Sequence, residues 1–145
     1  MVARGTHPTA VVKPGYKNFW LYTAVNPRTG DEFSLELPEV NADMMTTYLA
    51  HFRTAFPSSP LILVMDQAGW HKAKDLSVPE GITLVFLPPY SPELNPIERL
   101  WRWLRLHVCR NRLFHSLDDV EAALFAAWSK FTLSFLRQLC ACHYL

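Results

Sequence analysis

Apolar residues recur along this chain with two different periods, which together predict an α/β fold. Residues 19–25 and 32–37 are rich in aromatic and β-branched side chains and flank a turn at residues 26–30, so they predict a β-hairpin. The run at residues 61–65 (LILVM) is apolar without alternation, and residues 82–87 are predicted to be a further strand, with residues 84–87 buried. Such runs are typical of strands that are buried on both faces in the middle of an α/β sheet.

Helical periodicity and capping residues predict the remaining elements. Asn41 is a favoured N-cap for a helix at residues 42–56, and the pair Ser116 and Asp119 reads as a capping box for a later helix. The predicted helical segments are residues 42–56, a helix from Pro96 to about Val108, residues 117–128 and residues 133–140, and residues 72–76 are predicted to be a short helical or irregular piece. The predicted order is therefore hairpin, helix, strand, short helical piece, strand and a run of helices.

The predicted start of the helix near residue 96 fixes the position of one carboxylate, that of Glu98. Asn95 is a good N-cap, Pro96 fits N1, and Glu98 falls at N3, where its carboxylate can reach back to the cap. This position lies at the positive end of the helix dipole, which favours the ionised form that a hard metal ion needs. A plain capping box with a Glu98–Arg102 ion pair on a solvated face is the open alternative.

A second carboxylate, Asp66, directly follows the apolar run at residues 61–65. The carboxyl end of a central parallel strand is where open α/β sheets bind their ligands. Aspartate is also an ordinary strand-ending residue that caps a following helix, so this alternative stays open as well. If Asp66 and Glu98 converge at one sheet edge, their oxygens suit two divalent cations that clamp the attacking and leaving oxygens of a phosphoryl transfer.

Composition and charge narrow the class of protein. With 145 residues and 50% hydrophobic composition, residues 1–145 are predicted to form a single domain with its own core. The net charge is only +1, but residues 96–115 carry five arginines against the single acidic residue Glu98. This local basic surface is compatible with a polyanionic partner, although a solvated basic helix explains it nearly as well.

The three cysteines do not form a disulfide framework, so reduced thiols are the default. The sequence Cys140-x-Cys142-His143 has no second ligand pair at zinc-finger spacing. No apolar run is long enough for a membrane span, and the N-terminus has no signal-peptide core. We therefore expect a soluble, cytoplasmic protein.

Two stretches of the sequence resemble a known family. LILVMDQAGWHK at residues 61–72 and LVFLPPYSPELNPIERLWRWLR at residues 84–105 resemble the catalytic core of mariner-type DDE transposases of bacterial insertion sequences. The resemblance covers nearly the whole chain, from about Arg4 onward. It implies an α/β, ribonuclease-H-like mixed sheet that is flanked by helices.

The resemblance also implies roles for individual residues. Asp66 corresponds to the second acidic residue of the catalytic triad and Glu98 to the third, so both are expected to bind Mg²⁺ or Mn²⁺ in a two-metal site. His71 and Asn95 occupy family positions that support the metal ligands or face the DNA. Arg102 and Arg105 are likewise expected to support the ligands or to bind DNA.

The family's first catalytic Asp lies on a strand upstream of the segment that residues 4–8 resemble. We therefore expect the first strand, its Asp and the upstream helix-turn-helix region to be missing from this chain, which would leave the two-metal site incomplete. Asp31 and Asp43 do not match the missing position. The expected partners are transposon-end and target DNA, together with further copies of the chain or a separately encoded N-terminal part.

The function that the resemblance implies is transposition of an insertion sequence, a form of DNA recombination. The complete enzyme is expected to cleave DNA with a metal-activated water and to transfer the freed 3′ hydroxyl to a target strand. Whether this chain acts as an enzyme stays open, because two carboxylates hold two metals poorly. The alternative is a catalytically inactive, truncated remnant that folds and binds DNA or self-associates. An unrelated nuclease or helicase-associated domain of the same fold would share the carboxylates but not the run LPPYSPELNPIE.

Overall fold

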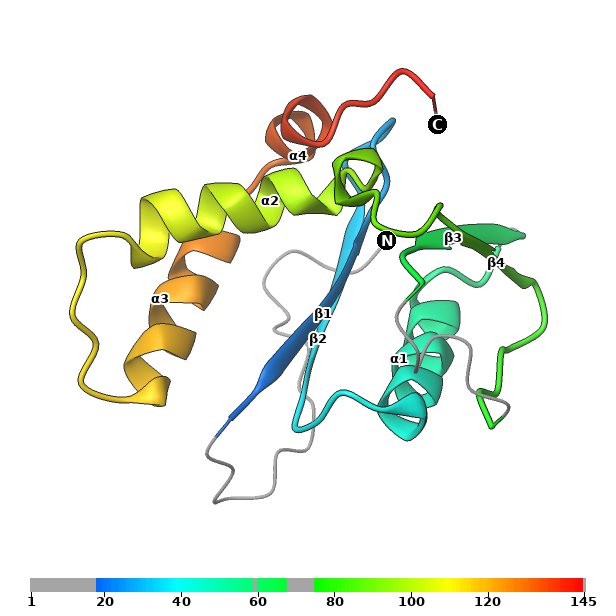
Figure 1. Cartoon of the computed structure of the whole chain (residues 1–145), viewed down its shortest axis with the longest axis horizontal. Helices are drawn as coiled ribbons and strands as arrows, with labels where there is room; N and C mark the ends of the chain where they lie inside the picture. The colour runs from blue at the N-terminus through cyan, green and yellow to red at the C-terminus, as the bar shows by residue number, and fades with distance from the viewer. Residues whose placement is uncertain (1–17, 59, 68–74, 145) are drawn as a thin grey trace. The chain divides into compact units, whose positions relative to one another are not determined.

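The structure is a computed structural model that describes residues 18–58, 60–67 and 75–144 (Figure 1). The chain divides into two compact units. Unit 1 holds the described residues up to Ala24 together with Phe33–Asn95, and unit 2 holds Val25–Glu32 together with the described residues from Pro96 onward. Each unit is described by itself below, and the single domain expected for residues 1–145 stays a prediction.

The predicted hairpin is present. Strands β1 (Trp20–Val25) and β2 (Glu32–Leu37) pair as a two-stranded sheet. Their connection closes with a backbone hydrogen bond of 2.7 Å from the Asn26 N–H to the Asp31 carbonyl. Such a short connection reverses the chain, since a parallel pair needs a longer crossover.

Helix α1 (Ala42–Ala55) supplies four of the nine buried side chains in the core of unit 1. The predicted N-cap is confirmed, because the Asn41 side chain accepts a hydrogen bond of 2.9 Å from the Met44 N–H. The buried side chains of this helix are Met45, Tyr48, Leu49 and Phe52. They share one core cluster with the buried side chains Tyr22, Leu35, Leu37, Met65 and Ile82 from the strands.

Strands β3 (Leu61–Met65) and β4 (Ile82–Phe86) form a second two-stranded sheet, and they run parallel in register from Leu61 opposite Ile82 to Met65 opposite Phe86. The prediction that both faces are buried is wrong, since Ile62 is 71% exposed and Val85 is 42% exposed. Alternate side chains of a strand point to opposite faces, so only the set that includes Met65 and Ile82 reaches the core that α1 shares.

The fold is therefore mixed α/β, as predicted, but its described strands form two separate sheets, β1–β2 and β3–β4, instead of one mixed sheet. Within unit 1, α1 connects the two sheets because its buried side chains share a cluster with both. The ribonuclease-H-like strand arrangement stays a prediction. So does the short helical piece at residues 72–76, most of which lies outside the described residues.

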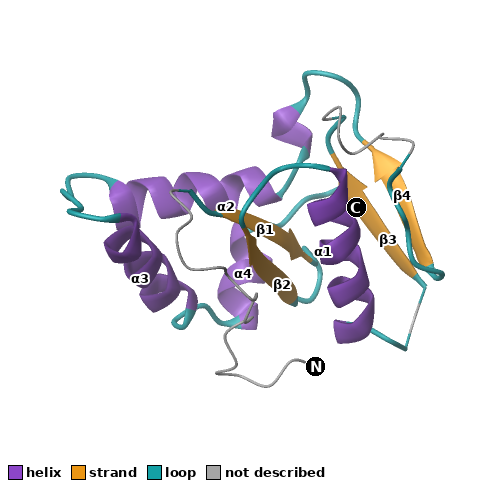
Figure 2. Cartoon of the chain, turned by 90° about the horizontal axis from the view of Figure 1, so that it is seen from below, coloured by secondary structure: helices purple, strands orange, loops and turns teal. Residues whose placement is uncertain are grey.

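Unit 2 is built from helices (Figure 2). Helix α2 (Ile97–Leu104) continues into a π-helical turn, η3 (Arg105–Cys109), in which the Arg110 N–H donates to the Arg105 carbonyl over 2.9 Å. Helix α3 (Leu117–Trp128) contacts η3, and helix α4 (Leu133–Leu139) contacts α2. The buried centre of this unit consists of Leu100, Leu104, Val108, Leu136 and Cys140.

Local capping signals set the ends of the later helices. The predicted capping box is confirmed: the Ser116 hydroxyl accepts from the Asp119 N–H over 3.2 Å, and the Asp119 carboxylate accepts from the Ser116 N–H over 3.1 Å. Thr132 caps α4 in the same way by accepting from the Phe135 N–H. None of the helices in the described part of the chain is long and apolar enough to cross a membrane.

Candidate active site

Asp66 lies at the carboxyl end of the parallel pair, where the sequence pattern predicted it. Met65, the last residue of β3, pairs with Phe86 of β4, and the Leu87 N–H donates to the Met65 carbonyl over 2.8 Å. Asp66 therefore leaves β3 beside the point where the chain leaves β4. Its side chain is exposed, so the carboxylate lies at the surface of the molecule.

Gln67 is a residue of this edge that sequence reasoning missed. Its side-chain amide donates a hydrogen bond of 2.8 Å to the Leu87 carbonyl. Together with the bond between Leu87 and Met65, this contact joins the ends of both strands on either side of Asp66. The backbone of Asp66 is thus held between two cross-strand hydrogen bonds. A polar residue that directly follows a strand-ending Asp was the available signal.

The predicted capping box at Glu98 is wrong. Pro92–Leu94 forms a short 3₁₀ helix, η2, and its Pro92 carbonyl accepts the Asn95 N–H over 2.9 Å. Asn95 therefore closes η2, and Pro96 becomes the N-cap of α2 without a side-chain cap hydrogen bond. Glu98 consequently lies at N2 instead of N3. It is half-buried and remains in the first turn, where the helix dipole favours a carboxylate.

The two carboxylates belong to different units, Asp66 to unit 1 and Glu98 to unit 2. Their convergence on one site therefore stays a prediction. In kind, carboxylate oxygens are the ligands that Mg²⁺ and Mn²⁺ prefer, so each residue fits such an ion chemically. In number the set is small: among the described residues, no group of three or more His, Cys, Asp or Glu side chains is arranged to hold a metal.

Comparison with known proteins decides the family. The model of one family, described as DDE superfamily endonuclease, matches residues 1–121. This chain belongs to the DDE endonuclease superfamily. The chain is also 42% identical over 112 residues to the uncharacterized protein y4pE/y4sA of Sinorhizobium fredii, which covers 77% of this chain and 83% of that relative. No solved structure matches the chain.

Membership of this superfamily implies a transposase-like nuclease function, with DNA as the class of substrate. Members generally use divalent metal ions. Both Asp66 and Glu98 lie inside the matched segment. The individual roles of these two residues stay predictions.

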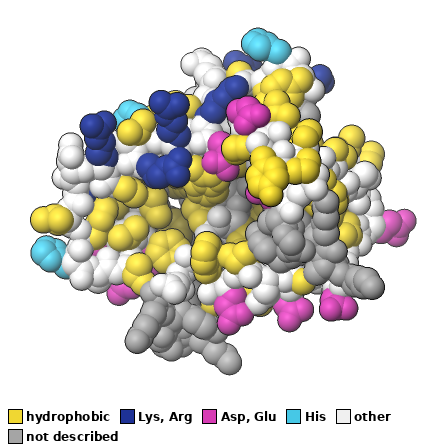
Figure 3. All heavy atoms as spheres, in the orientation of Figure 1, with side chains coloured by type: hydrophobic (Ala, Val, Ile, Leu, Met, Phe, Trp, Pro, Cys, Tyr) yellow, Lys and Arg dark blue, Asp and Glu magenta, His cyan; other side chains and the backbone are white. Residues whose placement is uncertain are grey.

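The basic surface of the chain lies along α2 and the segment after it (Figure 3). Arg102 and Arg105, two of the residues that were expected to support the ligands or to bind DNA, are both exposed there. Arg99 has a structural contact, since its guanidinium donates to the Ala141 carbonyl. Asn95 is half-buried at the end of unit 1, and His71 lies outside the described residues.

The three cysteines of the chain are free thiols, as predicted. Cys140 is fully buried in the core of unit 2. Burial raises the pKa of its thiol to about 11, although the nearby Arg99 guanidinium opposes this shift. A thiol with such a high pKa is protonated at neutral pH and is a poor nucleophile and metal ligand. Cys140 is therefore a core residue.

Proposed function

We propose that this DDE endonuclease is the catalytic portion of a mariner-type transposase of an insertion sequence, with a ribonuclease-H-like fold. The observation that carries the proposal is that the matched family segment contains both carboxylates, one of which ends a parallel strand pair. Asp66 and Glu98 would hold Mg²⁺ or Mn²⁺ together. The reaction would be cleavage of DNA at the transposon ends, followed by transfer of the 3′ end to target DNA.

Each side chain has a defined task in this proposal. The cations, when bound, supply positive charge that activates water and stabilises the oxygens of an in-line displacement. Asp66 offers its oxygens from a backbone that is held by the bonds of Leu87 and Gln67. Glu98 offers its oxygens from the first turn of α2. The exposed Arg102 and Arg105 would neutralise DNA phosphates near the reacting bond.

A cleavage assay tests this function. The full chain is incubated with Mn²⁺ and with duplex DNA that carries the ends of its own insertion sequence, and nicking is followed on a denaturing gel. Asp66→Asn and Glu98→Gln should each lower the cleavage rate by about a hundredfold or more, because a metal ligand supports several kcal/mol of transition-state stabilisation.

Two exposed or half-buried carboxylates outside the proposed site are matched controls. Asp43→Asn changes the first turn of α1, and Glu121→Gln changes α3, so both remove one negative charge in the same way. Both controls should cleave at the rate of the unchanged protein. Cleavage that survives in both Asp66→Asn and Glu98→Gln would contradict the assignment.

One observation favours a second candidate function. The described residues contain no cluster of three metal-ligating side chains, and two carboxylates alone hold two cations poorly. A chain of this kind would fold, bind DNA or self-associate without cutting it. This candidate predicts no nicking under any metal condition and no saturable Mn²⁺ binding in calorimetry. Tight Mn²⁺ binding would exclude it.

A further inference from the structure

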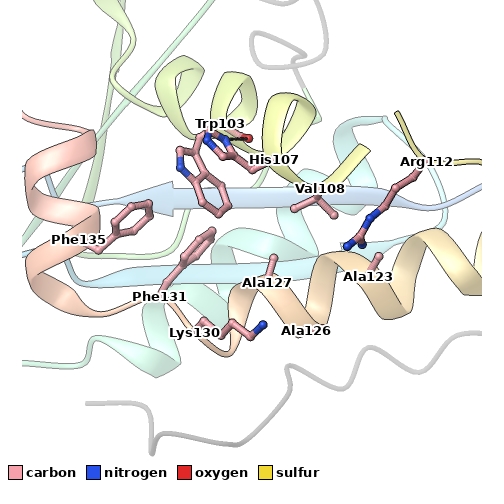
Figure 4. Close-up of a pocket in the computed structure, with 10 residues that line it drawn as sticks. All are labelled: Trp103, His107, Val108, Arg112, Ala123, Ala126, Ala127, Lys130, Phe131 and Phe135. Carbon is pink, nitrogen blue, oxygen red and sulfur yellow. Dashed lines mark hydrogen bonds between the residues drawn. The ribbon is translucent and has the colours of Figure 1, made fainter. Parts of the chain in front are cut away.

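A half-open pocket of about 400 Å³ lies within unit 2, and neither carboxylate contributes to it (Figure 4). Its lining residues come from the end of α2, from η3 and the residues after it, from α3, and from the segment that leads into α4. Its size falls within the range of roughly 300–1,000 Å³ that is typical of small-ligand sites. We call it the aromatic pocket; its walls are Trp103, Phe131 and Phe135, and its floor is Ala123, Ala126 and Ala127.

The aromatic wall is a packed cluster and not a set of loose side chains. The Trp103 ring meets the rings of Phe131 and Phe135 edge to face, with centroid distances of 5.2 and 5.3 Å. Phe131 and Phe135 stack on each other at 5.2 Å. Because these contacts fix the rings in place, the wall offers a preformed apolar surface. The small alanine side chains of the floor leave space in front of this wall.

Positive charge surrounds this apolar space. Arg112 extends toward α3 from one side and Lys130 extends along α3 from the other, and both side chains are exposed (Figure 4). Among the residues that the structure describes, none that lines the pocket is acidic. A ligand that fits this pocket therefore carries negative charge next to a flat apolar group.

His107 adds an oriented polar atom at the edge of the pocket. Its ring stacks on Trp103 at 4.5 Å with an interplanar angle of 13°, and its Nδ1 lies 2.9 Å from the Trp103 carbonyl. A carbonyl oxygen only accepts hydrogen bonds, so Nδ1 carries the proton of this bond. The ring therefore faces a ligand in the pocket only through Nε2.

We propose that the aromatic pocket binds an unpaired nucleotide of the DNA substrate, with the base against the aromatic wall and its flanking phosphates at Arg112 and Lys130. An aromatic side chain stacks on the π-face of a base. In a duplex, the neighbouring base pairs cover this face of the base. The pocket therefore selects single-stranded or extrahelical DNA. This inference rests on the proposed function, because it takes DNA as the substrate.

Binding without metal tests the proposal separately from cleavage. Affinity is measured in EDTA by fluorescence anisotropy for two duplexes with the same short single-stranded extension, one of normal nucleotides and one of abasic nucleotides. Both extensions carry the same phosphates, so only the bases differ. The unchanged protein should bind the extension with bases about tenfold more tightly, as expected for one or two stacked bases.

Two substitutions should remove this preference for bases. Trp103→Leu removes the stacking surface, and Ala126→Leu fills the pocket from an exposed position of α3, where leucine is compatible with the helix. Both variants should bind the two duplexes equally. Because Ala126 is exposed, its variant keeps the test valid even if Trp103→Leu unfolds. A base preference that persists in Ala126→Leu would overturn the proposal.

The cationic half of the pocket has its own test. Arg112→Gln and Lys130→Gln should each weaken binding of both duplexes and lower the slope of log Kd against log salt by about one. Arg137→Gln is the control, since Arg137 is an exposed arginine of α4 outside the lining. An effect of Arg137→Gln as large as those of the other two would show a diffuse charge effect and overturn the phosphate assignment.

The outcomes separate the two proposals. Mn²⁺-dependent cleavage together with an unchanged base preference in the pocket variants would overturn the pocket and leave the nuclease function intact. The absence of any DNA binding would overturn both. If Ala126→Leu changes the sedimentation coefficient instead of DNA binding, the pocket is an interface between copies of the chain and the nucleotide proposal is wrong.

Discussion

Cys140 illustrates how the surroundings of a single residue change its chemistry. The thiol has no solvent exposure, and burial raises its pKa from the ordinary value of 9.0 to about 11. Below about pH 9 the thiol is protonated in both the folded and the unfolded chain, so its contribution does not vary with pH. Between about pH 9 and 11 only the unfolded chain loses the proton, which makes unfolding more favourable as the pH rises.

The raised pKa of Cys140 therefore predicts how the stability of the chain changes at alkaline pH. The free energy of unfolding of the native chain should fall by up to about 1.4 kcal/mol per pH unit on account of Cys140. Urea denaturation at several values across that range measures the slope. Cys140→Ala should show a shallower slope, whereas Cys109→Ala should keep it. Equal slopes for the native chain and Cys140→Ala would contradict this account. Tyr22, whose pKa burial also raises, adds a background common to all variants.

At the residue scale, the sequence predicted one carboxylate better than the other. Asp66 was placed correctly because an Asp that ends an apolar run has little choice of position. The cap at Asn95 was wrong because the preceding Pro92–Leu94 turn competes for the same backbone N–H, and helix propensity alone does not reveal that competition. Gln67 was missed because its partner, the Leu87 carbonyl, is distant in sequence.

At the scale of elements, the hairpin turn approaches α4 closely. Gly30 has a positive φ of +83°, and a Cβ at this position would lie 1.9 Å from the Leu133 carbonyl oxygen. Gly81 has nearly the same φ, +84°, but its Cβ would meet only the end of the Arg53 side chain, at 3.0 Å. Comparing the same substitution at the two glycines therefore distinguishes the cost of backbone strain from the cost of a collision with a helix.

Alanine substitutions at these glycines should differ in their effect on stability. Gly81→Ala should lower the free energy of unfolding by about 1–2 kcal/mol, the cost of a left-handed conformation with a Cβ. Gly30→Ala should lower it by a further amount of about 1–3 kcal/mol, because the Leu133 backbone must also move. Thermal denaturation of both variants measures the difference. Equal losses would mean that the turn can move away from α4 freely.

The elements themselves were largely predictable, because local periodicity and capping chemistry determine them. Helix α3 with its Ser116 capping box and α1 with its Asn41 cap follow directly from the sequence. The one-sided burial of β3 was not predictable, since the apolar side chain of Ile62 reads the same whether or not another layer covers it. The aromatic pocket was also missed, because Trp103, Ala126 and Phe135 come from three different helices.

At the scale of the whole molecule, the exposed apolar side chains of β3 and β4 give a prediction about self-association. Ile62 and Val85 lie on the sheet face that the core of unit 1 does not use. We predict that the chain forms oligomers at micromolar concentration and that Ile62→Lys shifts it toward the monomer. Analytical ultracentrifugation measures both. A monomeric native chain, or an Ile62→Lys variant with unchanged assembly, would contradict the prediction.

Whether a shared metal site forms also depends on the whole molecule, because Asp66 belongs to unit 1 and Glu98 to unit 2. Neither carboxylate belongs to the core of its unit, so either one can be substituted without removing a core side chain. A shared site requires both carboxylates at once, whereas two independent carboxylates would bind cations weakly and separately. Local sequence patterns predict where each residue lies on its element, but not the long-range packing that would bring the two together.

The most direct test of a shared site is a double-mutant cycle on Mn²⁺ affinity, measured by calorimetry with the full chain and with Asp66→Asn, Glu98→Gln and the double variant. If both carboxylates bind the same ions, each single substitution should weaken binding by about tenfold or more, and the double substitution should add little to either. Losses that simply add, or single variants that bind Mn²⁺ as tightly as the native chain, would contradict the proposed active site.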